Sequence, residues 1–241
     1  MAKLNYRPEI DGLRAVAVLC VVFYHAGFAL FGGGYVGVDV FFVISGYLIT
    51  SLIVREVKET GAFRFGVFYL RRIRRLFPAL FSTTLVCWIA AFLFVSPEQM
   101  AGFGASALAA LTSLSNFCFW FEADYFDSAA VTKPLLHTWS LSVEEQFYFI
   151  WPALVVFLLV KLPRMGALAL VASLSIASLM VAEYWLASDR AAAFYLLPAR
   201  LVELAIGASL VWIESDRKLP NKVLEMGAFG GLALIIGSMF A

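Results

Sequence analysis

Long apolar runs alternate along this chain with short stretches that are polar or rich in glycine. Each run has close to the about 20 residues that an α-helix needs to cross a hydrocarbon core. The pattern predicts an all-α, polytopic transmembrane helical bundle with seven or eight membrane segments, in a single domain over residues 1–241. The clearest runs cover approximately residues 11–31, 35–54, 78–95, 142–160, 165–186, 191–213 and 223–241.

The first run carries two ionisable residues, Arg14 and His25, in an otherwise apolar segment. Asp11 is expected to cap this helix and the glycines at 32–34 to end it. Eleven helical residues bring Arg14 and His25 to within roughly 20° of one face, about 16 Å apart along the axis. Ionisable side chains at membrane depth usually mark a site, and neutral imidazole is a common general base. The structural alternative makes Arg14 a membrane-edge anchor and His25 an interhelical hydrogen-bonding group.

Residues 101–136 form a less regular segment. The segment is apolar and rich in Gly, Ala and Ser up to Phe121, and then acidic and aromatic. Simple alternation makes it a full span. Lys161 and Arg164, however, fall on the cytoplasmic side, where positive charge accumulates, only if this segment begins and ends outside. A re-entrant or interfacial segment is therefore as good a prediction as a full span.

Composition supports the membrane assignment. The chain is 62% hydrophobic and 15% charged, with a mean hydropathy of +0.87, whereas soluble domains are about half apolar. Basic residues concentrate between residues 55 and 75, which predicts that this connector is cytoplasmic. Nucleic acid is a poor partner for a basic cluster beside membrane spans. The three cysteines stand at no metal-ligand or disulfide spacing, so no metal is expected.

The basic connector ends in an amphipathic piece, residues 65–78, in which aromatic residues alternate with arginines. We expect it to lie at the cytoplasmic membrane surface, and the next span to start at Pro78. Such a cluster commonly binds anionic lipid. Arginine also matches the bidentate geometry of phosphate, so a phosphorylated cofactor is the alternative ligand. The four basic residues of this piece are Arg71, Arg72, Arg74 and Arg75.

Residues 34–50 contribute Asp39 and Ser45 as polar members of the second span, with Gly46 suited to close helix contact. Asp39 is near the same membrane face as His25, and we expect it to orient or charge-stabilise the imidazole.

Residues 135–152, LLHTWSLSVEEQFYFIWP, hold the densest polar group of the chain. Ser142 and Glu145 fit a capping box at a helix start. That role leaves His137, Trp139 and Glu144 unexplained, and adjacent carboxylates entering a span are costly. A later span adds Arg200 and Glu203 at i, i+3, which we expect to form a pair.

Together these segments resemble acyltransferase family 3, in its bacterial branch of membrane O-acyltransferases that modify surface polysaccharides. The resemblance covers about residues 6–213. It implies that an acyl group, usually acetyl, moves from cytoplasmic acyl-CoA to a carbohydrate hydroxyl outside. The motifs that carry it are Arg14 and His25 in an R-x10-H arrangement, GVDVFFVISGYLI, YLRRIRRLFP, FYLLPARLVELAIGA and, most specifically, HTWSLSVEEQFY.

The resemblance also implies the partners. The donor is acyl-CoA, expected to be acetyl-CoA, and the acceptor is a free or lipid-linked glycan such as O-antigen of lipopolysaccharide, exopolysaccharide or peptidoglycan. The protein is expected to be multi-pass in the bacterial inner membrane, with a cytoplasmic N-terminus. Many relatives carry an extracytoplasmic SGNH-type domain after the membrane region. The apolar run that reaches Ala241 predicts that this chain is the N-terminal portion of such a protein.

On these grounds His25 is the expected base or transient acyl carrier, and Asp39, Glu144 and Glu145 are further catalytic candidates. Arg14 and the arginines at 71, 72, 74 and 75 are expected to bind CoA. A transporter or channel remains the alternative, because the same polar residues could form a proton or solute pathway. The residues expected to line the substrate cavity are Ser45, His137, Trp139, Ser140, Tyr148, Arg200 and Glu203.

Overall fold

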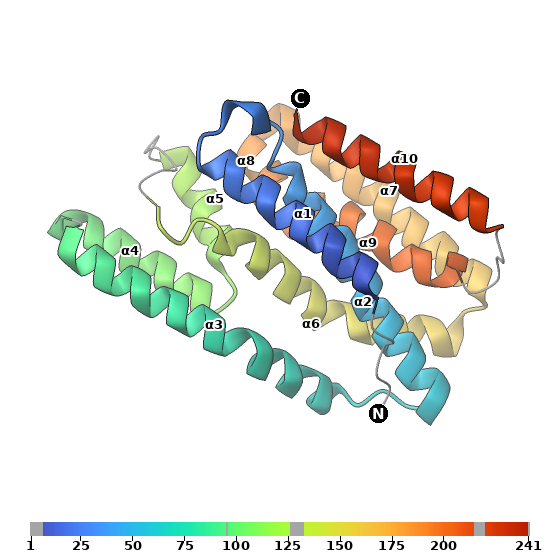
Figure 1. Ribbon diagram of the computed structural model, residues 1–241. Helices are drawn as coiled ribbons and strands as arrows, with labels where there is room; N and C mark the ends of the chain where they lie inside the picture. The colour runs from blue at the N-terminus through green and yellow to red at the C-terminus, as the bar shows by residue number, and fades with distance from the viewer. Residues whose placement is uncertain (1–6, 95, 126–132, 215–219, 241) are drawn as a thin grey trace.

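The computed structural model describes residues 7–94, 96–125, 133–214 and 220–240, and these residues form helices joined by short connections, with no strand among them (Figure 1). The all-α prediction is confirmed. The helices are α1 (Pro8–His25), α2 (Val36–Thr60), α3 (Phe65–Phe94), α4 (Pro97–Leu111), α5 (Ser115–Tyr125), α6 (Thr138–Lys161), α7 (Arg164–Ser188), α8 (Arg190–Tyr195), α9 (Leu197–Glu214) and α10 (Asn221–Met239), with a short 3-10 turn, η1, at Ala29–Phe31.

Six helical stretches of the described chain are long and apolar enough to cross a membrane. They confirm a multi-pass protein, although not the predicted count of seven or eight. Helix α1 is not among them, because its 18 residues include Glu9, Asp11 and Arg14. The six stretches are Val36–Thr60, Phe65–Phe94, Thr138–Leu159, Arg164–Ser188, Arg190–Ile213 and Lys222–Met239.

Helices α2 and α9 make the most extensive contact of the bundle. A Cβ atom on Gly46 would come within 1.9 Å of the Leu204 carbonyl oxygen, and one on Gly207 within 1.9 Å of the Val43 carbonyl oxygen. The backbone of α9 therefore packs directly against Gly46 of α2, and the backbone of α2 packs directly against Gly207 of α9. Small residues commonly allow such close helix contact in membrane bundles. The role expected for Gly46 is confirmed.

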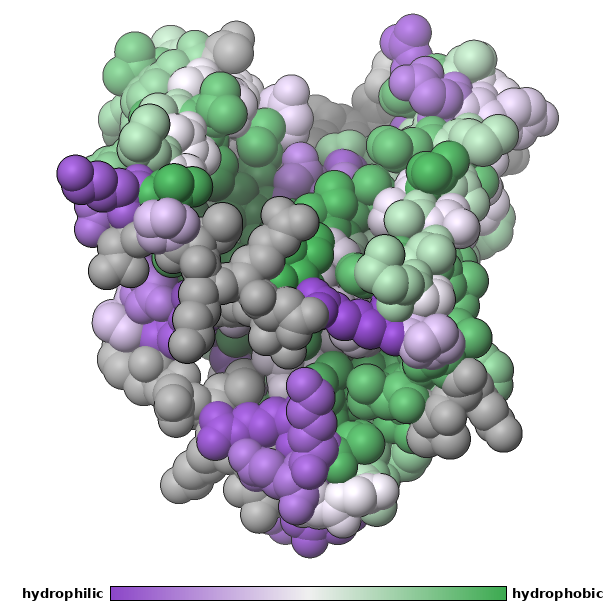
Figure 2. Space-filling model, turned by 90° about the vertical axis from the view of Figure 1, so that its right-hand side faces the viewer, coloured by the Kyte–Doolittle hydropathy of each residue, from purple (hydrophilic) through white to green (hydrophobic). Residues whose placement is uncertain are grey.

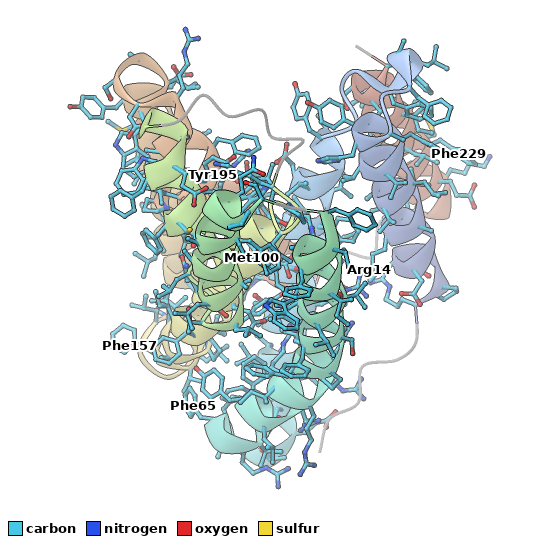
Figure 3. All side chains as sticks on the ribbon, turned by 90° about the vertical axis from the view of Figure 1, so that its left-hand side faces the viewer. Arg14, Phe65, Met100, Phe157, Tyr195 and Phe229 are labelled. Carbon is cyan, nitrogen blue, oxygen red and sulfur yellow. The ribbon has the colours of Figure 1, made fainter. Side chains whose placement is uncertain are left out.

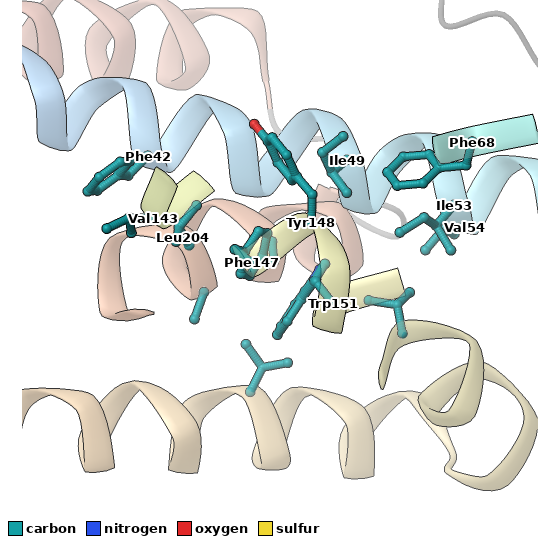
Figure 4. Packing of buried hydrophobic residues seen from close by; sticks show 14 of the residues in the cluster. Phe42, Ile49, Ile53, Val54, Phe68, Val143, Phe147, Tyr148, Trp151 and Leu204 are labelled. Carbon is teal, nitrogen blue, oxygen red and sulfur yellow. The ribbon is translucent and has the colours of Figure 1, made fainter. Parts of the chain in front are cut away.

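Helix α6 packs beside this pair and completes the core. Phe147 and Trp151 stack at 4.7 Å between ring centroids, and the Trp151 indole N–H donates to Thr50 Oγ1 at 2.8 Å. Figure 4 shows Phe147, Tyr148 and Trp151 of α6 grouped beside Ile49 of α2. A buried Trp N–H with a partner avoids an unpaired polar group in the core.

Helices α4 and α5 are short, at 15 and 11 residues. At 1.5 Å per residue they reach about 22 Å and 16 Å, less than a hydrocarbon core of about 30 Å. Helix α4 turns back along α3, and α5 returns toward the end that α3 reached (Figure 1). Ser113, with φ of 58°, makes the turn between them. Residues 97–125 therefore form two short helices and not one full span, and the re-entrant or interfacial alternative stays a prediction. The rest of the predicted segment includes residues outside the described chain.

The start and end of α1 differ from the prediction. The helix begins at Pro8, whose fixed φ suits a first helical position. Asp11 therefore lies within the first turn, and the expected cap by Asp11 is wrong. The helix ends at His25, well before the glycines at 32–34, because Gly27 takes a φ of 75° that glycine adopts easily.

Helix α3 runs unbroken through Pro78, so the predicted surface piece at residues 65–78 and the following span are one helix. The prediction that a span starts at Pro78 is wrong. Proline removes one backbone donor, but a membrane environment offers the remaining backbone groups no water, so the helix continues around it.

Helix α6 starts at Thr138, four residues before the predicted capping box, and that prediction is also wrong. Ser142 is buried inside the helix, where its Oγ lies 2.7 Å from Ser115 Oγ and accepts the Ser115 backbone N–H at 3.2 Å. The serine thus fastens α5 to α6. The run at residues 191–213 is interrupted at Leu196, where the backbone is extended between α8 and α9.

The outer surface is largely apolar, as a membrane protein requires. Figure 2 shows hydrophobic residues over much of one face and a hydrophilic group at its lower end. In Figure 1 this is the end at which α2 finishes and α3 begins. Exposed Lys58 and Glu59 lie in the last turn of α2 there.

Candidate functional site

A cavity of about 580 Å³ opens between α1, α2, α3 and α6, and we call it the arginine cavity. Arg14 enters it from α1, and Figure 3 shows this side chain extending between α1 and α3. Its polar lining also includes Ser45, Glu144 and Tyr148. The structure thus joins in one cavity residues that the sequence placed in separate motifs. The remaining lining residues are Arg71, Arg72, Arg74 and Arg75 with the apolar Leu48, Ile49, Leu52, Phe68 and Leu76.

The four arginines of α3 share one side of the helix, because positions i, i+1, i+3 and i+4 fall within one face. The Arg72 guanidinium carbon lies 3.9 Å from the centre of the Tyr148 ring, as in a cation–π contact. Arg74 and Arg75 are exposed, and no carboxylate pairs with either of them within the described ranges. The cavity is therefore strongly positive on the α3 side.

Glu144 supplies negative charge on the opposite wall. One carboxylate oxygen accepts the Ser45 hydroxyl at 3.0 Å, and the other accepts the Tyr148 hydroxyl at 2.7 Å. These bonds link α2 to α6 and fix the carboxylate. The neighbouring Glu145 is half-buried, and its Oε1 atom is buried with no hydrogen-bond partner among the described residues.

His25 is the last residue of α1, and its ring is exposed rather than deep in the bundle. Its Nδ1 atom lies 2.8 Å from the Val21 carbonyl oxygen. A carbonyl oxygen only accepts, so Nδ1 carries the hydrogen and Nε2 of the neutral ring keeps its lone pair. His25 does not line the arginine cavity, which begins at Arg14 on the same helix.

His137 stands at the N-terminal end of α6, directly before Thr138. The pKa of the His137 imidazole is below its ordinary value, mainly because burial removes hydration from the charged form. A backbone hydrogen bond at Pro134 raises this pKa, and the electrostatic effect of His25 lowers it. The two histidines are thus near enough to interact electrostatically. His137 and Tyr148 are eleven positions apart, as are Arg14 and His25, so α6 and α1 connect the same two regions.

Asp39 pairs with Arg200 in this structure, whereas the sequence-based expectation was that it orients or charge-stabilises the His25 imidazole. Its Oδ1 atom lies 3.3 Å from Arg200 Nη1, which is also 3.3 Å from Glu203 Oε1. The pairing predicted for Arg200 and Glu203 is confirmed. Arg200 Nε donates to the Phe194 carbonyl at 3.0 Å. That carbonyl is four residues before Pro198, which has no N–H to offer it.

Two further expected cavity residues lie outside the arginine cavity. Trp139 is buried, with its ring 4.6 Å from that of Phe194 and the Arg200 guanidinium 5.8 Å from its centre. The Ser140 hydroxyl donates to the His137 carbonyl at 3.3 Å. Both therefore belong to the region of Asp39 and Arg200 or to the start of α6.

Comparison with known proteins identifies the family. The family's acyltransferase domain matches residues 7–240. This chain belongs to acyltransferase family 3.

The curated relatives of this family member are bacterial. The chain is 39% identical over 214 residues to the peptidoglycan O-acetyltransferase OatA of Listeria monocytogenes, covering 87% of this chain and 34% of the relative. It is 40% identical over 232 residues to the putative peptidoglycan O-acetyltransferase YrhL of Bacillus subtilis, covering 91% and 36%. A putative O-acetyltransferase of Staphylococcus aureus is 34% identical over 245 residues, covering 97% and 40%. The chain thus spans little more than a third of their length. No solved structure matches.

Sequence reasoning about this acyltransferase domain missed the apolar wall of the cavity, which includes Leu48, Leu52 and Phe68. The sequence does not predict this wall, because an apolar residue in a span gives the same pattern whether its side chain faces lipid, the core or a cavity. It also missed Glu56, a buried carboxylate near the end of α2. A single Glu in a charged connector gives no sign that it is buried.

Proposed function

We propose that this chain is the donor-binding part of a membrane O-acyltransferase that moves an acyl group, acetyl in the first instance, from cytoplasmic acyl-CoA to a hydroxyl of a cell-envelope carbohydrate. The observation that carries the proposal is the convergence of five arginines, from α1 and α3, on one cavity. Guanidinium groups that pair with no carboxylate among the described residues, as at Arg74 and Arg75, suit the phosphates of CoA.

The charge distribution supports one orientation of the donor. Arg71, Arg74 and Arg75 make the exposed α3 side positive, whereas Glu144 offsets charge beside Arg14 and Arg72. Phosphates therefore bind at the α3 side. The uncharged pantetheine arm lies along the apolar wall and directs the thioester toward His25, about 16 Å beyond Arg14 along α1.

His25 then performs the chemistry by one of two routes. As a base, Nε2 accepts the proton of the acceptor hydroxyl while that oxygen attacks the thioester carbonyl; the C–S bond breaks and the CoA thiolate takes up the proton. As a carrier, Nε2 attacks the carbonyl and expels the CoA thiolate. The acceptor hydroxyl oxygen then attacks the acyl-imidazole carbonyl, the bond from that carbon to Nε2 breaks, and the hydroxyl proton passes to the thiolate. Both routes need the lone pair that the Nδ1–H···O=C bond to Val21 leaves on Nε2.

The names of the relatives indicate which acceptor to test first. Two of them carry peptidoglycan O-acetyltransferase in their names, so peptidoglycan is the first acceptor to test, with O-antigen and exopolysaccharide after it. We place the basic end of α2 and α3, and the N-terminus, in the cytoplasm of a bacterial inner membrane, because positive charge accumulates there. An extracytoplasmic SGNH-type domain, when it accompanies the chain, would receive the acyl group or the acceptor on the other side.

The proposal is tested by supplying membranes that contain the protein with radiolabelled acetyl-CoA and muropeptide acceptors. Label should enter the carbohydrate as an alkali-labile ester, and omission of the acceptor should abolish the product. A transporter or channel would leave the carbohydrate unlabelled while moving solute or protons across sealed vesicles. That result would refute the proposed acyltransferase activity.

A further inference from the structure

Glu56 is an unusual residue for a helix end at a membrane surface. It lies one turn before the end of α2, and its side chain is only 1% exposed. The carboxylate accepts the Arg64 backbone N–H at 3.3 Å and the Arg64 Nε–H at 3.4 Å. By contrast Glu59, three residues later, is 44% exposed and pairs with Arg55 on the same helix. Burial is therefore specific to Glu56.

The Glu56 carboxylate lies at the N-terminus of α3 and can therefore fix the direction of that helix. Arg64 immediately precedes the first residue of α3, Phe65, so Glu56 places a negative charge at the helix N-terminus, where backbone N–H groups lack partners. The connection is short and tightly shaped: Gly61 takes a φ of 74°, and the Thr60 hydroxyl bonds the Glu56 carbonyl at 2.8 Å. The direction in which α3 leaves α2 is set here.

Helix α3 has few other attachments near its arginines. One is the stack of Arg72 on Tyr148 of α6, with 3.9 Å between the guanidinium carbon and the ring centre, and two more lie close to the start of the helix. Phe68 is buried in the core and the Tyr69 hydroxyl donates to the Phe149 carbonyl at 2.9 Å, both within two turns of Glu56's contact with Arg64. Beyond them α3 packs mainly on α4. The arginines at 71 to 75 lie about 10 to 16 Å along the helix from Arg64, so a tilt of about 10° at its start moves them by about 2 to 3 Å.

We propose that Glu56 is a positioning residue that holds the α3 arginines over the cavity and thereby sets donor affinity. The proposal rests on the proposed acyl-CoA binding. A buried charge is costly unless it is paired, and a simple helix cap could be made by an exposed side chain, so a buried carboxylate is explained by the need to fix the helix direction.

The test compares Glu56→Gln with the matched control Glu59→Gln in the full chain. Glu56→Gln should raise the apparent KM for acetyl-CoA at least about threefold with kcat within about twofold, because misplaced binding groups lose affinity. Glu59→Gln should change neither. Arg75→Ala added to Glu56→Gln should raise KM less than it does alone, because both changes act through the same cluster. A fall in kcat with unchanged KM, or an equal effect of Glu59→Gln, would overturn the proposal.

A distance measurement separates this proposal from the proposed function. Spin labels at the exposed positions Phe77 on α3 and Ile150 on α6 report the helix separation without any ligand. Glu56→Gln should shift or broaden the distance by up to about 3 Å, and Arg64→Ala, which keeps the backbone bond, should shift it less. An unchanged distance overturns the positioning role even if acyl-CoA binds. A shifted distance in a protein that does not bind acyl-CoA overturns the proposed function instead. The labelled protein needs the three native cysteines replaced, namely Cys20, Cys87 and Cys118.

Discussion

The guanidinium of Arg72 stacks on the ring of Tyr148, with 3.9 Å between the guanidinium carbon and the ring centre. The stack joins α3 to α6 in the wall of the arginine cavity, and the Tyr148 hydroxyl donates a hydrogen bond to Glu144. Arg72 is thus held by the protein itself, whereas Arg74 and Arg75 are exposed cavity residues that pair with no carboxylate in the part of the chain that the structure describes. This division of roles makes the members of one arginine cluster distinguishable by mutation.

Arg75→Ala is expected to raise the apparent KM for acetyl-CoA about tenfold with little change in kcat, because a phosphate contact is the same in the ground and transition states. Arg75→Lys should recover only part of the affinity, since an ammonium keeps the charge without the planar fork. Arg72→Ala should raise KM too, and should also lower thermal stability because the Tyr148 stack is lost. Reduced turnover at saturating acetyl-CoA with unchanged KM would instead favour the anionic-lipid role.

His25→Ala is expected to lower acyl transfer by at least about 10²-fold, the usual contribution of a general base. Membrane insertion and yield should be unchanged, because the exposed ring makes only a local bond to Val21. Initial rates of ester formation at saturating donor provide the measurement. Val22→Ala, an exposed neighbour on α1, is the control. Ester formation at the wild-type rate in His25→Ala would exclude both proposed routes.

The protein has two histidines, so isotope-labelled imidazole gives two NMR signals and His25→Gln leaves one. The pKa of His137 should lie below that of an ordinary histidine and should rise in His25→Gln, because the electrostatic effect of His25, which lowers it, is removed. The rise should be incomplete, since loss of hydration still favours the neutral ring. A pKa of His137 that does not move would show that the two rings are too far apart to interact.

Gly207→Ala is expected to destabilise the protein by about 1 to 3 kcal/mol through overpacking. Its Cβ would meet the Val43 carbonyl oxygen at 1.9 Å, and backbone at that distance must shift. Gly227→Ala on α10 is the matched control, because a Cβ there meets nothing within 4 Å. Thermal melting in detergent checks the pair, and equal midpoints would contradict the close α2–α9 contact.

Lys58→Cys tests the topology. The position is exposed at the end of α2, where the basic end of the bundle is proposed to be cytoplasmic. A membrane-impermeant maleimide should label it only after the inner membrane is opened, in a background without the native cysteines. Labelling in intact spheroplasts would place the arginine cavity on the wrong side for cytoplasmic acyl-CoA.

The sequence by itself determined most of the helices, because the apolar length of a segment and its capacity to enter a membrane depend on local composition. It also determined the arginine face of α3 and the pair at Arg200 and Glu203, which helical spacing alone brings together. Three predictions from the sequence about where helices begin were wrong, at Asp11, Pro78 and Ser142. Each of these residues is of a type that commonly marks the start of a helix. At Pro78 and Ser142 continued backbone hydrogen bonding within the helix prevails over that signal.

Tertiary structure alone decided which helices meet. Asp39 pairs with Arg200, 161 residues further along the chain, and Ser142 of α6 contacts Ser115 of the short helix α5. The arginine cavity likewise exists only because α1, α3 and α6 converge around α2. The rotation and spacing of the helices depend on where backbones can approach, as at Gly46 and Gly207, and a one-dimensional pattern of apolar residues does not encode which helix fills the gap that a glycine leaves.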